Sequence, residues 1–436
     1  MSSSVIMGCA MFGVALILLC VNRPVIGFAV CFLLFIPAPL YPTPEFGWLF
    51  YGFAGFTLAV LIGWLARLHF RKGPFQCSMH ADRIGLSLTL WLVLCSIGLP
   101  LSVAFNQGDI TDRLFFYGKG VVPFVYLLVF FVVRALPVSM RQYQRILNYL
   151  VVVAIAFAIF TFGIYGVTQA RVTWLYAPLQ FPFVVLGANV AFVRSLMTES
   201  RRAAMGWGLV TALLALAAIL TFTKALIIAL VGSLALEAFL AIRNGSRRSS
   251  SRIITFGVSV TILAAGTVFL SSAQVRSNFV ELVSARLSDS TSTESRFSEW
   301  ESALTQFAQS PVIGKGVGYQ LERDVGGDTT LTTGYVHNQI AYSSMTMGIT
   351  GLFVFGLLVY QWGRSFFRKP ELSSQMMVIW VALHGCVFTL VAYAEMFATF
   401  RTIQHNFVLG VLLAMIVKIG PSEQTRAHMQ TPSVAI

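Results

Sequence analysis

The residues of this chain that could do chemistry gather in one polar stretch, residues 271–338, which holds about half of the acidic residues. Arg296 lies there in the run ESRFSEWESALTQF, and the pair His337–Asn338 stands at the far edge, where the next apolar run begins. An arginine can offset a developing negative charge, and an imidazole, which titrates near neutral pH, can act as a general base. A histidine at such a boundary can equally be a simple interfacial residue, so the residues alone leave both interpretations of His337 open.

Two further basic residues stand out because of where they lie. Lys224 interrupts the apolar run 207–242, and ionisable residues inside such runs are rare and usually functional. It is either a lysine that extends its amine to the membrane surface from a turn, or part of an anion site. Arg171 lies in QARVTWLYAP, a short link between two other apolar runs.

The sequence predicts a helix that carries Arg296. Residues 290–293 (STST) are good N-cap types, and Gln309–Pro311 end the pattern. Phe297, Trp300, Leu304 and Phe307 recur at helical spacing. We expect this stripe to face inward, with Arg296 beside it.

A glycine cluster, PVIGKGVG, follows that helix. Gly314, Gly316 and Gly318 allow a tight backbone that approaches its neighbours closely. The cluster is not a phosphate-binding P-loop, because the spacing of Lys315 is wrong and no serine or threonine follows it.

Neither a metal site nor a cofactor site is indicated. The six cysteines form no CxxC pair, and Glu322, Asp324 and Asp328 are the only spaced set of carboxylates. A solvated acidic loop explains that set better than a metal does. We therefore expect no metal and no cofactor.

The composition of the chain is that of a membrane protein. Of its 436 residues 57% are hydrophobic and 11% are charged, and the mean hydropathy is +0.77. Soluble domains usually carry about 25% charged residues. Because helices satisfy their own backbone in lipid and the runs lack barrel alternation, we expect an all-α polytopic membrane protein.

The apolar runs predict 12 or 13 transmembrane helices and one large loop that contains helices. The run 207–242 would be ~54 Å long as a helix, too long for a ~30 Å bilayer core, so we expect two helices joined by a turn at residues 221–224. The expected regions are a bundle (1–271), the loop (272–338), further spans (339–419) and a polar tail (420–436). The runs lie near residues 5–22, 25–40, 47–68, 84–104, 115–133, 146–168, 178–196, 207–242, 253–270, 339–361, 376–393 and 405–419.

The net charge of +13 reflects topology and not a nucleic-acid surface. Most of the 30 lysines and arginines lie in short loops after alternate apolar runs, which is the positive-inside pattern of cytoplasmic loops. The stretch 272–338 is mildly acidic, with five basic and eight acidic residues. We therefore place it on the opposite, exterior side of the membrane.

In this region the chain resembles the O-antigen ligase and O-antigen polymerase superfamily. The shared pattern is Arg296 followed by Trp300, then the cluster from Pro311 to Gly318, then His337–Asn338, then a span that opens with Gly-x-x-Gly at Gly348 and Gly351. The family usually has Ser-Arg at a turn before its long loop, whereas this chain has Thr223–Lys224, which keeps the charge and loses the guanidinium fork.

The resemblance implies a glycosyltransferase of the multi-span (GT-C-like) membrane type in the bacterial inner membrane, with its active site facing the periplasm. The donor would be a glycan on undecaprenyl diphosphate, and the acceptor a sugar hydroxyl of lipid A-core. His337 would be the base, while Arg296, Lys224 and Arg171 would bind the diphosphate in a metal-independent, inverting transfer. Asn338, Trp300 and Gly316 would support the site.

Three alternatives remain open. An O-antigen polymerase or a protein O-oligosaccharyltransferase would share the donor and differ in the acceptor. A transporter of lipid-linked glycans or small anions is the alternative of another class. It predicts charged groups at mid-membrane and on both faces, whereas the candidate cations here gather at one face.

Overall fold

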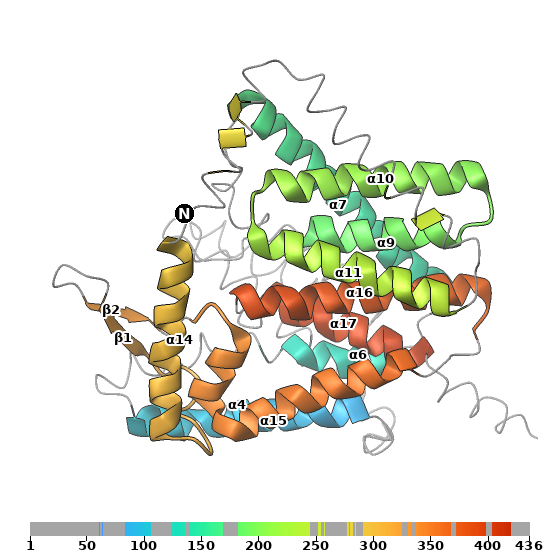
Figure 1. Ribbon diagram of the computed structural model, residues 1–436. Coiled ribbons are helices and arrows are strands. Elements are labelled where there is room, and N and C mark those ends of the chain that lie inside the picture. Colours follow the sequence, from blue (N-terminus) through green and yellow to red (C-terminus); the bar gives the residue numbers. More distant parts are fainter. Residues whose placement is uncertain are drawn as a thin grey trace, which may run out of the picture.

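Helices dominate the computed structural model, which is shown in Figure 1. The helices are α4 (Arg83–Phe105), the 3-10 turn η2 (Tyr126–Leu128), α6 (Val129–Ala135), α7 (Met140–Thr168), α9 (Phe183–Met197), α10 (Arg201–Leu220), α11 (Lys224–Arg243), α14 (Thr291–Gln309), α15 (Gln339–Phe367), α16 (Ser374–Phe397) and α17 (Ile403–Ile419). The structure describes residues 61, 63, 83–105, 124, 126–135, 139–168, 182–244, 252–253, 257, 277–278, 280–281, 284, 291–324, 330–333, 336–367, 372–397 and 403–419.

Among the described residues, six helices are long and apolar enough to cross a membrane, namely α4, α7, α10, α11, α15 and α16. Three shorter apolar helices accompany them, at Tyr126–Ala135, Phe183–Met197 and Gln404–Ile419. The all-α polytopic class is therefore confirmed. The total of 12 or 13 spans stays a prediction, because the runs 5–22, 25–40, 47–68 and 253–270 lie wholly or almost wholly outside the described residues.

The long run 207–242 is divided as expected. The helix α10 ends at Leu220 and α11 begins at Lys224, with Phe222 in the turn at a φ of 48°. Thr221 closes α10 by donating from its hydroxyl to the carbonyl of Ala218 at 2.7 Å. The turn therefore places Lys224 at an end of the bundle.

The bundle has two distinct ends. The helices α9, α10, α11, α16 and α17 run side by side in Figure 1, and α14 crosses one end of them. We call that end, where Lys224 and the start of α15 lie, the site end. The opposite end carries Arg194, Arg201, Arg243 and Arg364, and we call it the arginine end.

Two arginines at the arginine end bind groups of neighbouring helices. Arg243 donates to the carbonyl oxygens of Phe366 and Phe367, both at 2.7 Å, and so satisfies the last turn of α15. Arg194 donates to Asn148 at 2.5 Å and lies 4.7 Å from the centroid of the Trp207 ring. Arg194 and Arg243 therefore join neighbouring helices.

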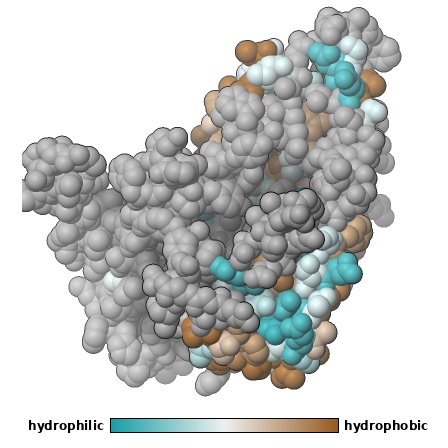
Figure 2. Space-filling model, turned by 90° about the vertical axis from the view of Figure 1, so that its left-hand side faces the viewer, coloured by the Kyte–Doolittle hydropathy of each residue, from teal (hydrophilic) through white to brown (hydrophobic). Residues whose placement is uncertain are grey.

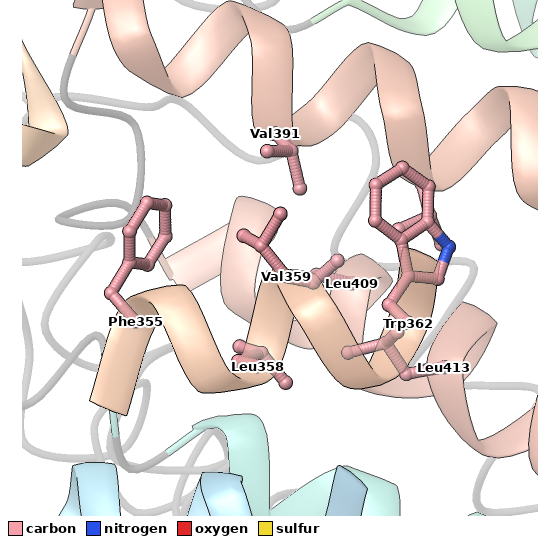
Figure 3. A pocket seen from close by; sticks show the side chains of 8 residues that line it. Phe355, Leu358, Val359, Trp362, Val391, Leu409 and Leu413 are labelled. Carbon is pink, nitrogen blue, oxygen red and sulfur yellow. The ribbon is translucent and has the colours of Figure 1, made fainter. Parts of the chain in front are cut away.

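Between α15, α16 and α17 the bundle leaves a small crevice, shown in Figure 3. Its lining is entirely apolar, so it offers no group for binding a polar substrate or for acid–base chemistry. The residues that line it are Phe355, Leu358, Val359, Trp362, Val387, Val391, Leu409 and Leu413.

The helix α14 has the predicted bounds, but it buries the opposite face to the predicted one. Phe297, Trp300 and Leu304 are 66%, 41% and 52% exposed, so the apolar stripe faces outward. The buried face instead carries Glu299 and Ala303. The prediction of an inward stripe was wrong because a polar contact of Glu299 and the small side chain of Ala303 select the face that packs on α15.

The helix α15 is broken at Gly348, where φ is 64° and ψ is −154°. The glycine cluster fills the break with backbone hydrogen bonds. On one side Lys315 and Gly316 donate to the carbonyls of Met345 and Thr346, both at 2.9 Å. On the other side the N–H groups of Ile349 and Thr350 donate to the carbonyls of Pro311 and Val312, at 2.8 and 3.3 Å.

This arrangement follows from the requirement that backbone groups inside a membrane bundle be paired. A broken helix exposes carbonyls at one side of the break and N–H groups at the other. The cluster 311–318 supplies partners for both sides, which requires very close approach. A Cβ on Gly316 would overlap the backbone of Gly98 and Ser102 in α4, which confirms the expected close approach of the glycine cluster.

The hairpin of β1 (Leu321–Asp324) and β2 (Thr330–Thr333) follows the cluster. Its antiparallel register pairs Leu321 with Thr333 and Asp324 with Thr330. The hairpin was not predicted, and it turns the chain back toward His337.

We predict that Gly316→Ala lowers the melting temperature of the purified protein in detergent. The positive φ of 93° alone would cost about 1–3 kcal/mol for alanine, before the overlap with α4 is counted. The matched control is Gly356→Ala in α15, where an added Cβ meets nothing within 4 Å. The control should melt at or above the wild-type temperature. Equal melting of Gly316→Ala and wild type would contradict the packing of the cluster on α4.

Candidate functional site

The centre of the candidate site is a contact between His337 and Glu299 of α14. The Nδ1 atom of His337 lies 2.7 Å from Oε2 and 3.0 Å from Oε1 of Glu299. The backbone N–H of His337 also donates to Oε2 at 3.1 Å. Glu299 is buried, while the His337 side chain is 33% exposed. The carboxylate therefore holds both the ring and the backbone of the histidine.

This contact determines which ring nitrogen can accept a proton. A carboxylate only accepts hydrogen bonds, so a neutral His337 donates from Nδ1–H to Glu299. Nε2 is then the basic nitrogen of the ring. If Nε2 takes up a proton, the buried carboxylate stabilises the resulting imidazolium.

Asn338 fixes the backbone next to this histidine. Its Oδ1 accepts from the N–H of Ala341 at 2.8 Å, which is an N-cap contact for α15. Its Nδ2 donates to the backbone carbonyl of Glu395 in α16 at 2.6 Å and to Oε2 of the same residue at 3.2 Å. Asn338 therefore joins the start of α15 to the end of α16.

Arg296 lies on the same helix as Glu299, one turn earlier, and its side chain is half-buried. Positions three apart on a helix lie on neighbouring parts of one face. Trp300 follows Glu299 directly and turns toward the outside. The fold therefore brings Arg296 and the His337–Glu299 pair to one side of α14.

Lys224 lies at the same end of the bundle on another helix. It is the first residue of α11, is half-buried, and is followed by Leu226, which shares a buried cluster with Tyr393 of α16. No hydrogen bond or ion pair among the described residues joins Lys224 to Arg296 or His337. Arg171 lies outside the described residues.

Figure 2 looks onto this end, and its described surface is mixed, with hydrophilic residues directly beside hydrophobic ones. Gly316 lies inside, at the break of α15, and contributes to the site through the fold. Within the described residues, no group of three or more His, Cys, Asp or Glu side chains could hold a metal ion.

Three residues near this end were missed by reasoning from sequence. Glu299 was counted only as a charge and Glu395 was not considered, although each binds a residue of the His337–Asn338 pair. Lys315 is only 8% exposed, and its Nζ lies 4.5 Å from the Phe105 ring centroid and 6.0 Å from that of Tyr319. The signal for Glu299 was its position one turn from Arg296 on the expected helix.

A comparison with known protein families identifies the same part of the chain. Residues 209–356 match the family model described as O-antigen ligase. The chain carries an O-antigen ligase family domain. The matched segment contains Lys224, Arg296, Glu299 and His337 and ends just beyond the break at Gly348. A search of curated proteins gives no match to the chain.

O-antigen ligase family members are glycosyltransferase-like enzymes of lipopolysaccharide biosynthesis. A match to this family points to a lipid-linked glycan as substrate and a membrane environment, in line with the apolar helices of the bundle. Glu395 lies outside the matched segment, although its contact with Asn338 supports the family domain from α16.

We predict that neutral His337 carries its proton on Nδ1. Nitrogen NMR of protein labelled with ¹⁵N-histidine reports the tautomer, and the His337 signal is identified by its loss in His337→Gln. In Glu299→Ala the carboxylate acceptor is gone, so the population protonated on Nε2 should increase. Glu301→Ala, an exposed position on α14, is the control and should leave the signal unchanged. A wild-type His337 protonated mainly on Nε2 would contradict the proposed pairing.

Proposed function

We propose that this protein is an O-antigen ligase that transfers a glycan from undecaprenyl diphosphate to a sugar hydroxyl of lipid A-core. The observation that carries the proposal is the His337–Glu299 pair, which lies inside the family domain next to Arg296. The pair supplies a base for a hydroxyl acceptor. The neighbouring cation supplies a partner for a diphosphate leaving group.

His337 acts as the general base. Nε2 removes the proton from the acceptor hydroxyl while that oxygen attacks the anomeric carbon of the donor glycan. Glu299 stabilises the imidazolium and keeps the ring oriented. Attack from the face opposite the diphosphate inverts the anomeric centre.

Basic residues stabilise the leaving group. When the bond between the anomeric carbon and the diphosphate oxygen breaks, its electron pair passes to the diphosphate, whose added charge needs nearby cations. Arg296 is the main candidate, with Lys224 from α11 and Arg171 behind it. Lys224 acts as a point charge, because it lacks the planar fork with which an arginine binds phosphate.

The two ends of the bundle support one orientation in the membrane. Arg194, Arg201, Arg243 and Arg364 gather at the arginine end, which the positive-inside rule assigns to the cytoplasm. The site end then faces the periplasm of a bacterial inner membrane. Lipid-linked donor and lipid A-core acceptor would both reach it there from the outer leaflet.

The acceptor distinguishes this proposal from its neighbours. A polymerase would transfer the glycan to another lipid-linked glycan, and a protein O-oligosaccharyltransferase to a serine or threonine hydroxyl. The same base and the same cations would serve all three reactions. Which acceptor becomes glycosylated by the purified protein therefore decides among them.

We predict that His337→Ala and Arg296→Ala each reduce transfer by at least about 100-fold, since one loses the base and the other a cation at the leaving group. The measurement is a ligation assay with purified protein, lipid-linked donor and lipid A-core. Glu301→Ala serves as the control on the same helix and should keep full activity. Both variants should still insert into the membrane. Full activity in both would overturn the assignment of these residues.

We also predict that chelators leave the transfer rate unchanged, because the proposed mechanism stabilises the diphosphate with basic side chains. The same ligation assay is run with and without a strong chelator of divalent ions. Activity that disappears in chelator and returns with a divalent ion would refute metal independence and would leave the transferase assignment standing.

A further inference from the structure

The described part of the bundle interior contains a carboxyl group for which the proposed transfer has no use. Glu237 of α11 is 0% exposed. Neither of its carboxyl oxygens has a hydrogen-bond partner in the described part of the protein. Glu237 lies 13 residues from Lys224, or ~20 Å along the helix axis, and so inside the span. An ionisable side chain at such a place is a functional candidate.

The facing helix makes room for this carboxyl group. The side chain of Glu237 lies against Gly385 of α16, and a Cβ on that glycine would overlap Oε1, Cδ and Cγ of Glu237. The carboxyl group is therefore enclosed at the contact between α11 and α16.

The polar groups next to it are already paired with one another. One turn from Glu237, Ser233 donates to Oδ1 of Asn189 in α9 at 2.8 Å. Asn189 in turn donates from Nδ2 to the hydroxyl of Thr389, one turn from Gly385, also at 2.8 Å. This chain links α9, α11 and α16 and leaves Glu237 out.

None of the described charged or titratable side chains on the surrounding helices forms an ion pair or a hydrogen bond with Glu237. On α16, His384 accepts from Trp362 at 3.1 Å and Cys386 donates to the carbonyl of Leu186. Arg194 of α9 binds Asn148, and Arg243 of α11 itself binds the end of α15. No described ion pair includes Glu237, and α10 contributes Arg201 and Arg202 only at its exposed start.

An isolated carboxylate in such a place is strongly disfavoured. Removing an unpaired charge from water costs far more than removing a neutral acid, and the group is neutralised instead. A small cation is a poor alternative, because the polar side chains of Ser233, Asn189 and Thr389 already hydrogen-bond to each other. Since no described side chain supplies a positive charge, a proton neutralises the carboxylate without any rearrangement.

We propose that Glu237 is an intramembrane proton-binding site, occupied in the folded protein, that keeps α11 and α16 packed together. Both helices end at the candidate active site: α11 begins with Lys224, and α16 ends near Glu395, which binds Asn338. Loss of the proton would place a charge at Gly385 and draw water between the helices. Protonation or deprotonation of Glu237 therefore changes the distance between Lys224 and the His337–Asn338 pair.

The test uses dicyclohexylcarbodiimide, an apolar reagent that adds to protonated carboxyl groups, on the full-length protein in lipid nanodiscs at neutral pH. Mass spectrometry should find the adduct on Glu237 in the wild type and no adduct at that position in Glu237→Gln. A water-soluble carbodiimide should label the exposed Glu301 and leave Glu237 unmodified. Infrared spectra should also show a protonated-carboxyl band that is lost in Glu237→Gln, a measurement that does not depend on reagent access.

Absence of that infrared band, or labelling of Glu237 by the water-soluble reagent as readily as Glu301, would overturn the proton site. The glutamine variant is neutral and of the same size, so it should keep transfer activity and resist the reagent, whereas the labelled wild type should lose activity in proportion to adduct. Full labelling with full activity would overturn the link to the active site. Because labelling and infrared absorption need no glycan transfer, their outcome is independent of the function proposed above.

Discussion

The requirement that every backbone group within the bundle be paired determines how this protein arranges its site. The helix α15 breaks at Gly348, and the cluster 311–318 supplies partners for both sides of the break. The helix α14 ends immediately before that cluster, and His337 stands at the start of α15. Glu299 and His337 therefore both lie on helices that meet at the junction between the cluster 311–318 and the break of α15. This explains how a long polar segment can hold the two side chains in contact.

The charged side chains differ between the two ends of the bundle, the site end and the arginine end. At the arginine end, Arg243 binds carbonyl groups at the end of α15, and Arg194 binds Asn148 of α7. At the other end Arg296 and Lys224 lie on the same side as the His337–Glu299 pair, where an anionic lipid-linked substrate would need them. Glu237 is the exception inside the bundle. Its burial between two helices that carry site residues is what suggests that the interior and the site are linked.

Several features of this fold could be predicted from local pattern alone. The turn at residues 221–224 followed from the length of an apolar run and the thickness of a bilayer, and the bounds of α14 followed from its N-cap residues and its end at Pro311. The buried face of α14 could not be predicted in this way. Its apolar stripe suggested one face, and the contact with a histidine 38 residues away selected another. Hydrophobicity is a weak guide for a helix that crosses the end of a membrane bundle.

The break of α15 and the role of Glu299 were equally hidden. Gly348 was noticed as part of a glycine pair, but a glycine at a break and an ordinary helical glycine such as Gly356 look the same in sequence. Glu299 was one of eight acidic residues in a polar stretch. Its position one turn from Arg296 was a local signal, but its contact with His337 and its burial are visible only in the fold. Each depends on a long-range contact that no local pattern encodes.

The central claim is that Glu299 acts through His337. A double-mutant cycle on the transfer rate tests it most directly, with Glu299→Ala, His337→Ala and the variant that carries both changes. If the carboxylate works only by orienting the imidazole and stabilising its charge, the double variant should be no slower than His337→Ala alone. If the two losses multiply instead, Glu299 and His337 act independently, and the carboxylate is not the group that prepares the histidine for catalysis.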